Sequence, residues 1–237
     1  MIRGTLIKTT LVNYPGKVAA AYFMSGCNLY CPYCYNTELV ENTLPDKDAV
    51  TPTDVLEHLK KRKNVLGGIV LSGGEPLIHP ELADFISEIK KYSICVKIDT
   101  NGMLPGQLKA LFNKKETSPD FVALDIKTAP KRYYELTRDK KYARVYEKNI
   151  QESIQFVSGL PANKREFRTV LVPPLVTEAE IKTIGALLPK DASWQFAEFR
   201  AENCIDHTYN SIDPYSSEHI NQLVANAKKS IKNAELR

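Results

Sequence analysis

An α/β fold with a parallel sheet is what this sequence predicts, on the strength of two observations. Short runs rich in β-branched and aromatic residues, typical of strands, recur along the chain. Longer amphipathic runs, typical of helices, lie between them. Strands and helices that alternate at this spacing form right-handed crossovers, which make the strands parallel. The six expected units fit an open, partial (β/α)6 barrel better than a closed eight-stranded one, and the pattern is also compatible with a doubly wound sheet.

The expected elements follow from this pattern. The strands cover residues 18–23, 67–72, 94–100, 121–127, 165–173 and 194–200. The helices cover residues 51–62, 79–92, 105–115, 146–157 and 177–188, and a further helix is expected at 217–232. Thr51 or Thr53 is expected to cap the first helix, and Pro80 falls early in the first turn of the second. Thr177 and Glu180 have the spacing of a capping box.

Composition limits the class of protein. A chain of 237 residues, 43% of them hydrophobic and 25% charged, can bury a full core and is expected to form one domain over residues 1–237. An odd count of five cysteines and an N-terminus without a long apolar run argue against a disulfide framework, so we expect a cytoplasmic protein. No run is long enough for a membrane helix, and a formal charge of +4 gives little reason to expect nucleic acid as a partner.

Residues that can bind ligands or take part in catalysis lie just beyond the expected strands. The carboxyl ends of parallel strands open onto one face, where α/β proteins bind ligands, so these segments are expected to converge there. In strand order they are Cys27 with Cys31 and Cys34, then Gly73 to Pro76, Asp99 to Gly102, Asp125 with Lys127, Pro173 with Pro174, and Arg200.

Three cysteines in the spacing C-x3-C-x2-C suit an iron-sulfur cluster. Cys27, Cys31 and Cys34 can each hold one iron of a 4Fe–4S cubane, which leaves the fourth iron open to another ligand. A zinc site with three cysteines and one histidine is an alternative, although the four histidines are remote in sequence. Three buried core cysteines are the other alternative, and the intervening Asn28 and Pro32 favour a loop instead.

The same stretch resembles a known family. The segment "YPGKVAAAYFMSGCNLYCPYCYN", followed by "GGEP", is similar to the radical S-adenosylmethionine (SAM) superfamily, through Tyr33 before the last cysteine and through Gly26 and Asn36. Within it, the likeness is to activases of glycyl radical enzymes, above all activating proteins of anaerobic ribonucleoside-triphosphate reductase that resemble pyruvate formate-lyase activase. The segments "SGGEPLIHPEL", "DTNG", "ALDIK", "FRTVLVP" and "EFR" extend it over residues 14–200, which leaves 201–237 as a C-terminal helical extension.

The resemblance implies a partial, TIM-like (β/α)6 barrel with two cofactors, a 4Fe–4S cluster and SAM. In this family the amino and carboxylate groups of SAM chelate the open iron, which explains why three thiolates are wanted and not four. An electron from the reduced cluster then cleaves SAM to methionine and a 5′-deoxyadenosyl radical, and the protein positions and shields this chemistry. An activase uses the radical to abstract hydrogen from a backbone glycine of its partner enzyme.

The resemblance also implies contacts to SAM. Gly73, Gly74 and the carboxylate of Glu75 would bind the methionine ammonium, because glycines permit close backbone approach. Acidic groups near SAM would be Asp99 and Asp125, the basic partners of its carboxylate or ribose would be Lys127 and Arg168, and Tyr33 would cover the adenine. Without the resemblance, the Gly-Gly-Glu-Pro run would be an ordinary turn and the Asp125–Lys127 couple a surface ion pair.

Two further cysteines and three departures from the family pattern limit how much of the family's site can be assigned to this chain. Cys95 falls in a strand and is expected to be a small buried hydrophobe, and Cys204 is expected to be structural as well. Two leftover thiols are too few for an accessory ferredoxin-like cluster. Tyr35 stands where related sequences commonly carry histidine and Thr37 where they carry proline, while Ala197 stands where formate-lyase activases place a histidine.

Three functions are compatible with the sequence. The first is an activase whose partner is a glycyl radical enzyme, anaerobic ribonucleotide reductase by resemblance, with a flavodoxin or ferredoxin-type electron donor. The second is a radical SAM enzyme that acts on a small molecule or peptide, like 7-carboxy-7-deazaguanine synthase. The third is a non-catalytic iron-sulfur or zinc binding module, which would leave "GGEP" and "DTNG" without a role. The activase-like residues around Gly26 and Asn36 favour the first.

Overall fold

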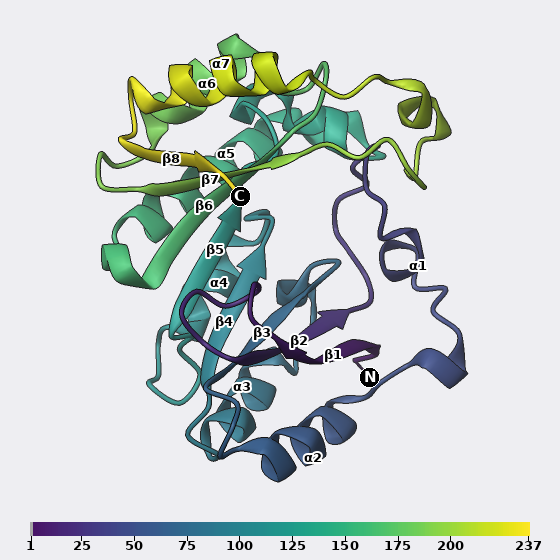
Figure 1. Ribbon diagram of the computed structural model, residues 1–237. Coiled ribbons are helices and arrows are strands. Elements are labelled where there is room, and N and C mark those ends of the chain that lie inside the picture. Colours follow the sequence, from purple (N-terminus) through teal and green to yellow (C-terminus); the bar gives the residue numbers. More distant parts are fainter. Residues whose placement is uncertain (1) are drawn as a thin grey trace. The chain divides into compact units, whose positions relative to one another are not determined.

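The computed structural model describes residues 2–237 and has the α/β organisation that the sequence predicts (Figure 1). Its strands follow one another in sequence order in the sheet: β1 (Gly4–Thr10), β2 (Ala19–Met24), β3 (Gly68–Gly73), β4 (Cys95–Thr100), β5 (Phe121–Asp125), β6 (Arg165–Leu171), β7 (Ser193–Glu198) and β8 (Asn233–Leu236). The helices are α1 (Thr37–Val40), α2 (Pro52–Arg62), α3 (Leu82–Lys90), α4 (Pro105–Leu111), α5 (Ala143–Ser158), α6 (Glu178–Leu187) and α7 (Ser217–Lys228).

The chain divides into two compact units. Among the described residues, the first comprises 2–28, 38–100 and 106–122, and therefore holds β1 to β4 with α2 and α3. The second comprises residues 29–37, 101–105 and 123–237, and holds β6 to β8 with α5 to α7. Strand β5 carries the chain from the first unit into the second.

In the first unit a parallel ladder orders the ends of the strands. Strand β2 pairs in parallel with β3 from Ala19↔Gly68 to Met24↔Gly73, and β3 pairs in parallel with β4. The alanines that begin β2 and the aliphatic run Ile69–Leu71 of β3 are fully buried, as expected for a strand covered on both faces. Strand β1 pairs antiparallel with β2 and forms the edge. This register ends β2 and β3 side by side, so the segments that follow them start together.

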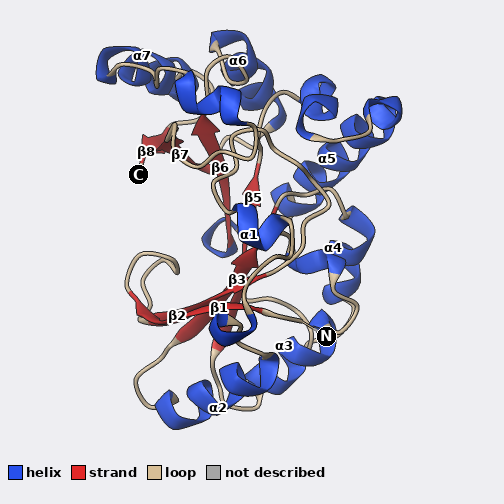
Figure 2. Cartoon of the chain, turned by 90° about the vertical axis from the view of Figure 1, so that its right-hand side faces the viewer, coloured by secondary structure: helices blue, strands red, loops and turns tan. Residues whose placement is uncertain are grey.

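The helices of the first unit begin close to where capping residues predict. Thr51, and not Thr53, caps α2, and its side chain and that of Asp54 form a reciprocal capping box. Helices α2 and α3 pack side by side (Figures 1 and 2).

Helix α3 begins at Leu82, so the expectation that Pro80 lies in its first turn was wrong. Proline keeps the preceding residue out of the helical region, and His79 is extended accordingly, which delays the helix.

The second unit repeats the parallel arrangement. Strand β6 pairs with β7 and β7 with β8, all in parallel, while the backbone N–H of Ile126 beyond β5 donates to the carbonyl of Arg168 in β6, 2.8 Å away. Trp194 of β7 is fully buried, and its indole N–H donates to the Thr169 hydroxyl. Helices α6 and α7 lie side by side (Figures 1 and 2), and Thr177 with Glu180 forms the expected capping box of α6.

All six expected strands and all six expected helices occur, with shifted ends. Strand β5 ends at Asp125 and β7 at Glu198, so Lys127 and Arg200 lie just beyond the strands that were expected to contain them. Strands β1 and β8 are additional to the prediction. Among residues 2–237, no helix is both long and apolar enough to cross a bilayer.

Candidate active site

The turn after β3 is built for close backbone approach. Gly73 has φ +118°, and a Cβ placed on it would lie 2.2 Å from the backbone nitrogen of Met24. A Cβ on Gly74 would lie 1.9 Å from the carbonyl oxygen of Gly26 and 3.2 Å from the Cβ of Cys27. Both positions therefore exclude a side chain. The structure thus brings the Gly-Gly turn against the residue pair Gly26–Cys27, 46 or more positions away in sequence.

Glu75 is fully buried and held at several points. Its backbone N–H donates to the Gly26 carbonyl, 2.9 Å away. Its Oε1 accepts from the hydroxyl of Thr100 at 2.8 Å and from the backbone N–H of Leu77 at 3.1 Å, which makes it the cap of a 3-10 helix, Pro76–Ile78. A buried carboxylate fixed by two donors on one oxygen has a defined direction, which suits it to receive a cation.

Residues next to Cys27 have unexpected neighbours. The ring Nε2 of His79 lies 3.0 Å from the carbonyl oxygen of Ser25, so a histidine remote in sequence is near the segment that leads to Cys27. Burial lowers the pKa of His79. The Ser25 hydroxyl is buried and has no hydrogen-bond partner within the described residues. Most buried polar groups in folded proteins have a hydrogen-bond partner, so this hydroxyl is available for a contact with a bound molecule or water.

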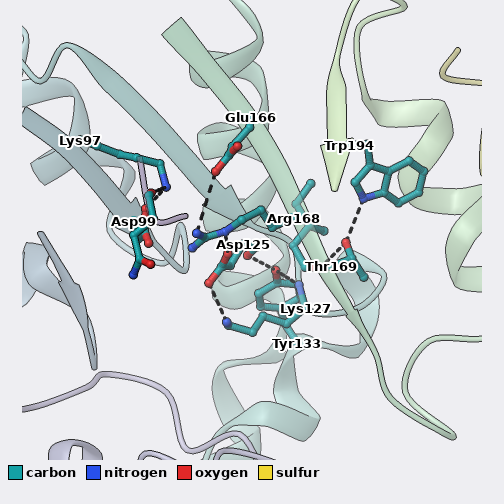
Figure 3. Close-up of polar contacts among 11 residues, drawn as sticks. Lys97, Asp99, Asp125, Lys127, Tyr133, Glu166, Arg168, Thr169 and Trp194 are labelled. Carbon is teal, nitrogen blue, oxygen red and sulfur yellow. Dashed lines mark hydrogen bonds and ion pairs between the residues drawn. The ribbon is translucent and has the colours of Figure 1, made fainter. Parts of the chain in front are cut away.

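Asp99, near the end of β4, pairs with a residue that the sequence analysis missed. Lys97 is fully buried, and its Nζ lies 2.8 Å from Oδ1 of Asp99 and 3.0 Å from the carbonyl oxygen of Asn13. Its ammonium also lies 5.9 Å from the centre of the Phe121 ring. The pair is among the residues drawn in Figure 3. The only signal in the sequence was the two-residue spacing on one strand, which places both side chains on the same face.

In the second unit, Cys31 and Cys34 lie on residues 29–37, which we call the cysteine loop. The N–H of Cys34 donates to the carbonyl of Cys31 at 3.0 Å, which closes a tight turn around the second and third cysteines. Burial raises the pKa of the Cys34 thiol. Tyr33 between them is buried, and its hydroxyl has no hydrogen-bond partner within the described residues. Tyr35, by contrast, is 60% exposed.

Asp125 lies between two cations (Figure 3). Its Oδ1 accepts from Nε of Arg168 at 2.6 Å, and its Oδ2 from Nζ of Lys127 at 3.0 Å. Burial alone would raise the pKa of Asp125, but the charges and hydrogen bonds of the two cations outweigh it and hold the pKa well below its usual value. Burial opposes the charge of Lys127, and Asp125 overcomes it, so the pKa of Lys127 lies well above its usual value. All three side chains are only partly exposed.

Two further residues belong to this group, and sequence reasoning missed both. The buried Tyr133 accepts the backbone N–H of Lys127 at its hydroxyl, 3.0 Å away, so it fixes the chain just after β5. Glu166 is buried two residues before Arg168 in β6, with Oε1 3.9 Å from the guanidinium. Nothing in the sequence marked Tyr133, since it lies on a 3-10 helix, Pro130–Leu136, whose position depends on tertiary packing.

The remaining cysteines are placed differently. Cys95 begins β4 and packs, partly buried, against the apolar cluster that contains Tyr14 and Val70. Cys204 is 1% exposed, and its pKa is raised by burial and by the nearby Cys34. All five thiols are free of disulfides. Over residues 2–237, no group of three or more His, Cys, Asp and Glu side chains is already arranged as a metal-ion site.

Comparison with known proteins identifies the family. Residues 21–159, more than half of the chain, match the family model of the radical SAM superfamily. The chain belongs to the radical SAM superfamily. The superfamily's cofactors, a 4Fe–4S cluster and SAM, are therefore the cofactors of this enzyme.

Individual relatives extend the likeness beyond the matched region. A protein of Methanocaldococcus jannaschii, named as a proposed glycyl-radical enzyme activating enzyme, is 27% identical over 98% of this chain and 94% of its own. The pyruvate formate-lyase-activating enzyme of Clostridium pasteurianum is 36% identical over 122 residues, about half of each chain. The crystal structure of QueE from Escherichia coli superimposes with a TM-score of 0.55 over 99% of this chain and 92% of its own, at 14% identity. That likeness shows the fold, the partial (β/α)6 core of radical SAM enzymes.

Proposed function

We propose that this chain is a radical SAM activase that generates a glycyl radical on a partner enzyme, and that the partner is an anaerobic ribonucleotide reductase. One observation carries the activase part of the proposal, and the choice of ribonucleotide reductase as the partner rests on the sequence resemblance around Gly26 and Asn36. The likeness to the M. jannaschii protein spans 98% of this chain and 94% of that protein, so it includes the parts outside the shared superfamily core. The local likeness to the C. pasteurianum activase supports the same branch.

The cysteines Cys27, Cys31 and Cys34 are the proposed cluster ligands. Three free thiols in one short segment are a donor set that iron prefers, and no fourth cysteine is needed when SAM completes the coordination. The Gly73–Gly74 turn packs its backbone directly against residues 24–27, which holds the segment with Cys27 close to the turn. When bound, the two cofactors supply the radical chemistry, and the chain binds, orients and shields them.

The proposed SAM contacts have matching chemistry. Glu75, buried and fixed in direction, would accept a hydrogen bond from the methionine amino group, together with the backbone of Gly73 and Gly74. Asp99 would accept from the ribose, and the Asp125–Lys127–Arg168 group would present charges to the ribose or carboxylate. Tyr33, whose buried hydroxyl has no hydrogen-bond partner among residues 2–237, would lie against the adenine. These residue roles are part of the proposed function.

The remaining features of the proposal follow from the activase role. The substrate is a glycine-bearing loop of another protein, and the electron donor is a flavodoxin or ferredoxin-type protein. On this proposal the enzyme acts in the cytoplasm together with both partners. The chain acts as one functional radical SAM domain, with the extension 201–237 as part of it.

The first test is anaerobic reconstitution with iron and sulfide, then dithionite reduction and electron paramagnetic resonance with and without SAM. We expect a reduced-cluster signal that changes when SAM is added, together with 5′-deoxyadenosine in the products. A cluster that is indifferent to SAM, or bound zinc instead of iron, would contradict the proposed ligands and the enzyme role.

A second test separates the activase from other radical SAM enzymes. The reduced enzyme is mixed with SAM and an anaerobic ribonucleotide reductase, and the glycyl radical signal of the partner is recorded. A radical on the partner, lost when its glycine is changed to alanine, supports the proposal. If 5′-deoxyadenosine forms and no glycyl radical appears on any glycyl radical enzyme tried, the enzyme acts on a small molecule or peptide instead.

A further inference from the structure

The segment that follows β7 lies along the cysteine loop. Within the second unit, the backbone N–H of Ile205 donates to the carbonyl of Cys34 at 2.9 Å, and that of Asp206 donates to the carbonyl of Pro32 at 3.0 Å. Both hydrogen bonds are donated by this segment to the cysteine loop, and the acceptor number falls from 34 to 32 as the donor number rises from 205 to 206, so the two segments run antiparallel to each other. We call residues 204–206 the clamp segment.

The clamp segment is itself anchored. The backbone N–H of Cys204 donates to Oδ1 of Asn210 at 2.9 Å, and the Cys204 side chain is 1% exposed. Asp206 caps the 3-10 helix His207–Ser211 by accepting from the backbone N–H of Thr208 at 2.9 Å. Both ends of the clamp segment are therefore fixed, Cys204 by burial and by the Asn210 acceptor and Asp206 by its capping hydrogen bond, so the segment can hold another segment in place.

The opposite end of the cysteine loop is held as well. The N–H of Tyr30 donates to the carbonyl of Leu136 at 2.8 Å, and the Arg138 guanidinium stacks 3.8 Å from the centre of the Tyr30 ring. Residues 29–36 form neither helix nor strand. A loop without regular structure must satisfy its backbone through such outside partners, so its shape depends on them.

We propose that the clamp segment is a positioning element for the iron-sulfur cluster: it fixes the loop that carries Cys31 and Cys34 and thereby slows loss of iron from the bound cluster. The inference rests on the proposed cluster ligands and gives a role to the C-terminal extension. Ile205 and Asn210 act through the cysteine loop and do not touch the cofactors. Cys204 packs the clamp and is not a ligand.

The test uses two pairs of variants. Ile205→Pro removes the N–H that donates to Cys34, and Ile205→Val keeps it. Asn210→Ala removes the acceptor that anchors Cys204, and Asn210→Asp keeps an oxygen there. The full-length protein is reconstituted, and release of iron to an excess of ferrous chelator is followed by absorbance. We expect release about fivefold faster in Ile205→Pro and Asn210→Ala, the effect of one lost hydrogen bond, and rates near wild type in Ile205→Val and Asn210→Asp.

Amide hydrogen exchange of the metal-free proteins provides a readout that does not depend on SAM or on activity. We expect faster exchange of residues 30–36 in Asn210→Ala than in Asn210→Asp, with thermal midpoints unchanged between the two. Equal iron release in both members of each pair overturns the proposal, even where the loop exchanges faster. Iron release and amide exchange are measured without a partner enzyme. A negative result in the activase test therefore does not change them, and the two proposals can fail independently.

A further variant checks the role given to Cys204. Cys204→Ala should bind the same amount of iron as wild type and give the same spectrum after reduction. If it binds as little iron as Cys31→Ala, Cys204 is a ligand, and the positioning role is overturned.

Discussion

Cys31 gives the most direct test at the scale of a single residue. We expect Cys31→Ala to lose the 4Fe–4S signal and SAM cleavage, because two thiolates cannot hold the cubane, while its circular dichroism and thermal midpoint stay close to those of the metal-free wild type. Iron content, the reduced-cluster spectrum and 5′-deoxyadenosine are the measurements. Cys95→Ala is the matched control, since Cys95 packs in an apolar cluster, and it should keep full iron content. Retained SAM cleavage in Cys31→Ala would remove Cys31 from the ligand set.

Glu75 carries a charge and also caps a 3-10 helix, and one substitution separates the two. Glu75→Gln keeps an oxygen that can accept from Thr100 and Leu77 but removes the negative charge. We expect the cluster to assemble normally and SAM affinity to fall by about 1.5–3 kcal/mol, the range for a hydrogen bond to a charged group. Calorimetric titration of the reconstituted protein with SAM measures this. An unchanged affinity would take Glu75 out of the SAM site.

Lys97 is expected to stabilise the folded protein because it compensates the charge of Asp99. Removing one member of a buried ion pair costs about 3–5 kcal/mol, since the other charge loses its compensation. We expect Lys97→Met to be destabilised by about this amount, because its Nζ lies 2.8 Å from the Asp99 carboxylate. Denaturant unfolding of the metal-free protein measures the change.

The double variant Lys97→Met/Asp99→Asn is the control for this pair. We expect it to be more stable than Lys97→Met alone, because no buried charge is then left at either position. If the effects of the two substitutions simply add, Lys97 does not stabilise the protein through Asp99.

At the scale of elements, the turn between β3 and α3 depends on the absence of a side chain. We expect Gly74→Ala to destabilise the protein by about 1–3 kcal/mol, because its Cβ would lie 1.9 Å from the Gly26 carbonyl oxygen and the backbone must shift. Gly106→Ala in α4 is the matched control, since among residues 2–237 no atom beyond its chain neighbours and its own helix backbone lies within 4 Å of its Cβ, and it should be stabilising by about 0.5–1 kcal/mol. Denaturant unfolding compares the two, and equal effects would mean that the turn relaxes freely.

Which elements could be predicted depends on how much of each is buried. Strands β2, β3 and β4 are central and apolar, so their composition alone marks them. Strand β1 has three consecutive exposed residues at Ile7–Thr9, and β8 has four residues of which one is buried, so neither shows an apolar run. Edge strands are defined by pairing with a neighbour, which the sequence of the strand does not contain.

Over the whole molecule, the sequence indicated which segments follow the strands, and tertiary contacts supply the supports of the candidate residues in each unit. The parallel topology predicts that segments after successive strands converge, and the hydrogen bonds between Gly74–Glu75 and Met24–Gly26 confirm this for two of them. Lys97, Tyr133 and the clamp segment were not predicted as parts of the site. The clamp segment acts through a contact that only the fold brings about, Asp206 with Pro32, and Lys97 likewise contacts the carbonyl of Asn13, 84 residues away in sequence.

The charged group around Asp125 also ties the stability of the molecule to pH. The pKa of Asp125 is lower in the folded protein than its unfolded value of about 3.9, so the group contributes its full stability above about pH 4. Below about pH 4, Asp125 binds a proton in the unfolded chain and stays ionised in the folded protein. Stability therefore falls as the pH drops toward the folded-state pKa of Asp125. The pKa of Lys127 is raised, so its contribution is complete below its unfolded value of about 10.4 and is lost only at higher pH.

We therefore expect Asp125→Asn to be less stable than wild type at pH 7 and the difference to shrink steadily between pH 4 and pH 2. Urea unfolding of the metal-free proteins at a series of pH values measures it. Lys127→Met, which removes one of the two cations, should lose stability on acidification with a slope between those of wild type and Asp125→Asn, because Arg168 still faces the carboxylate 2.6 Å away. Parallel curves for all three proteins would show that Asp125 keeps an ordinary pKa in the folded state and that its two cations are held in place by other contacts.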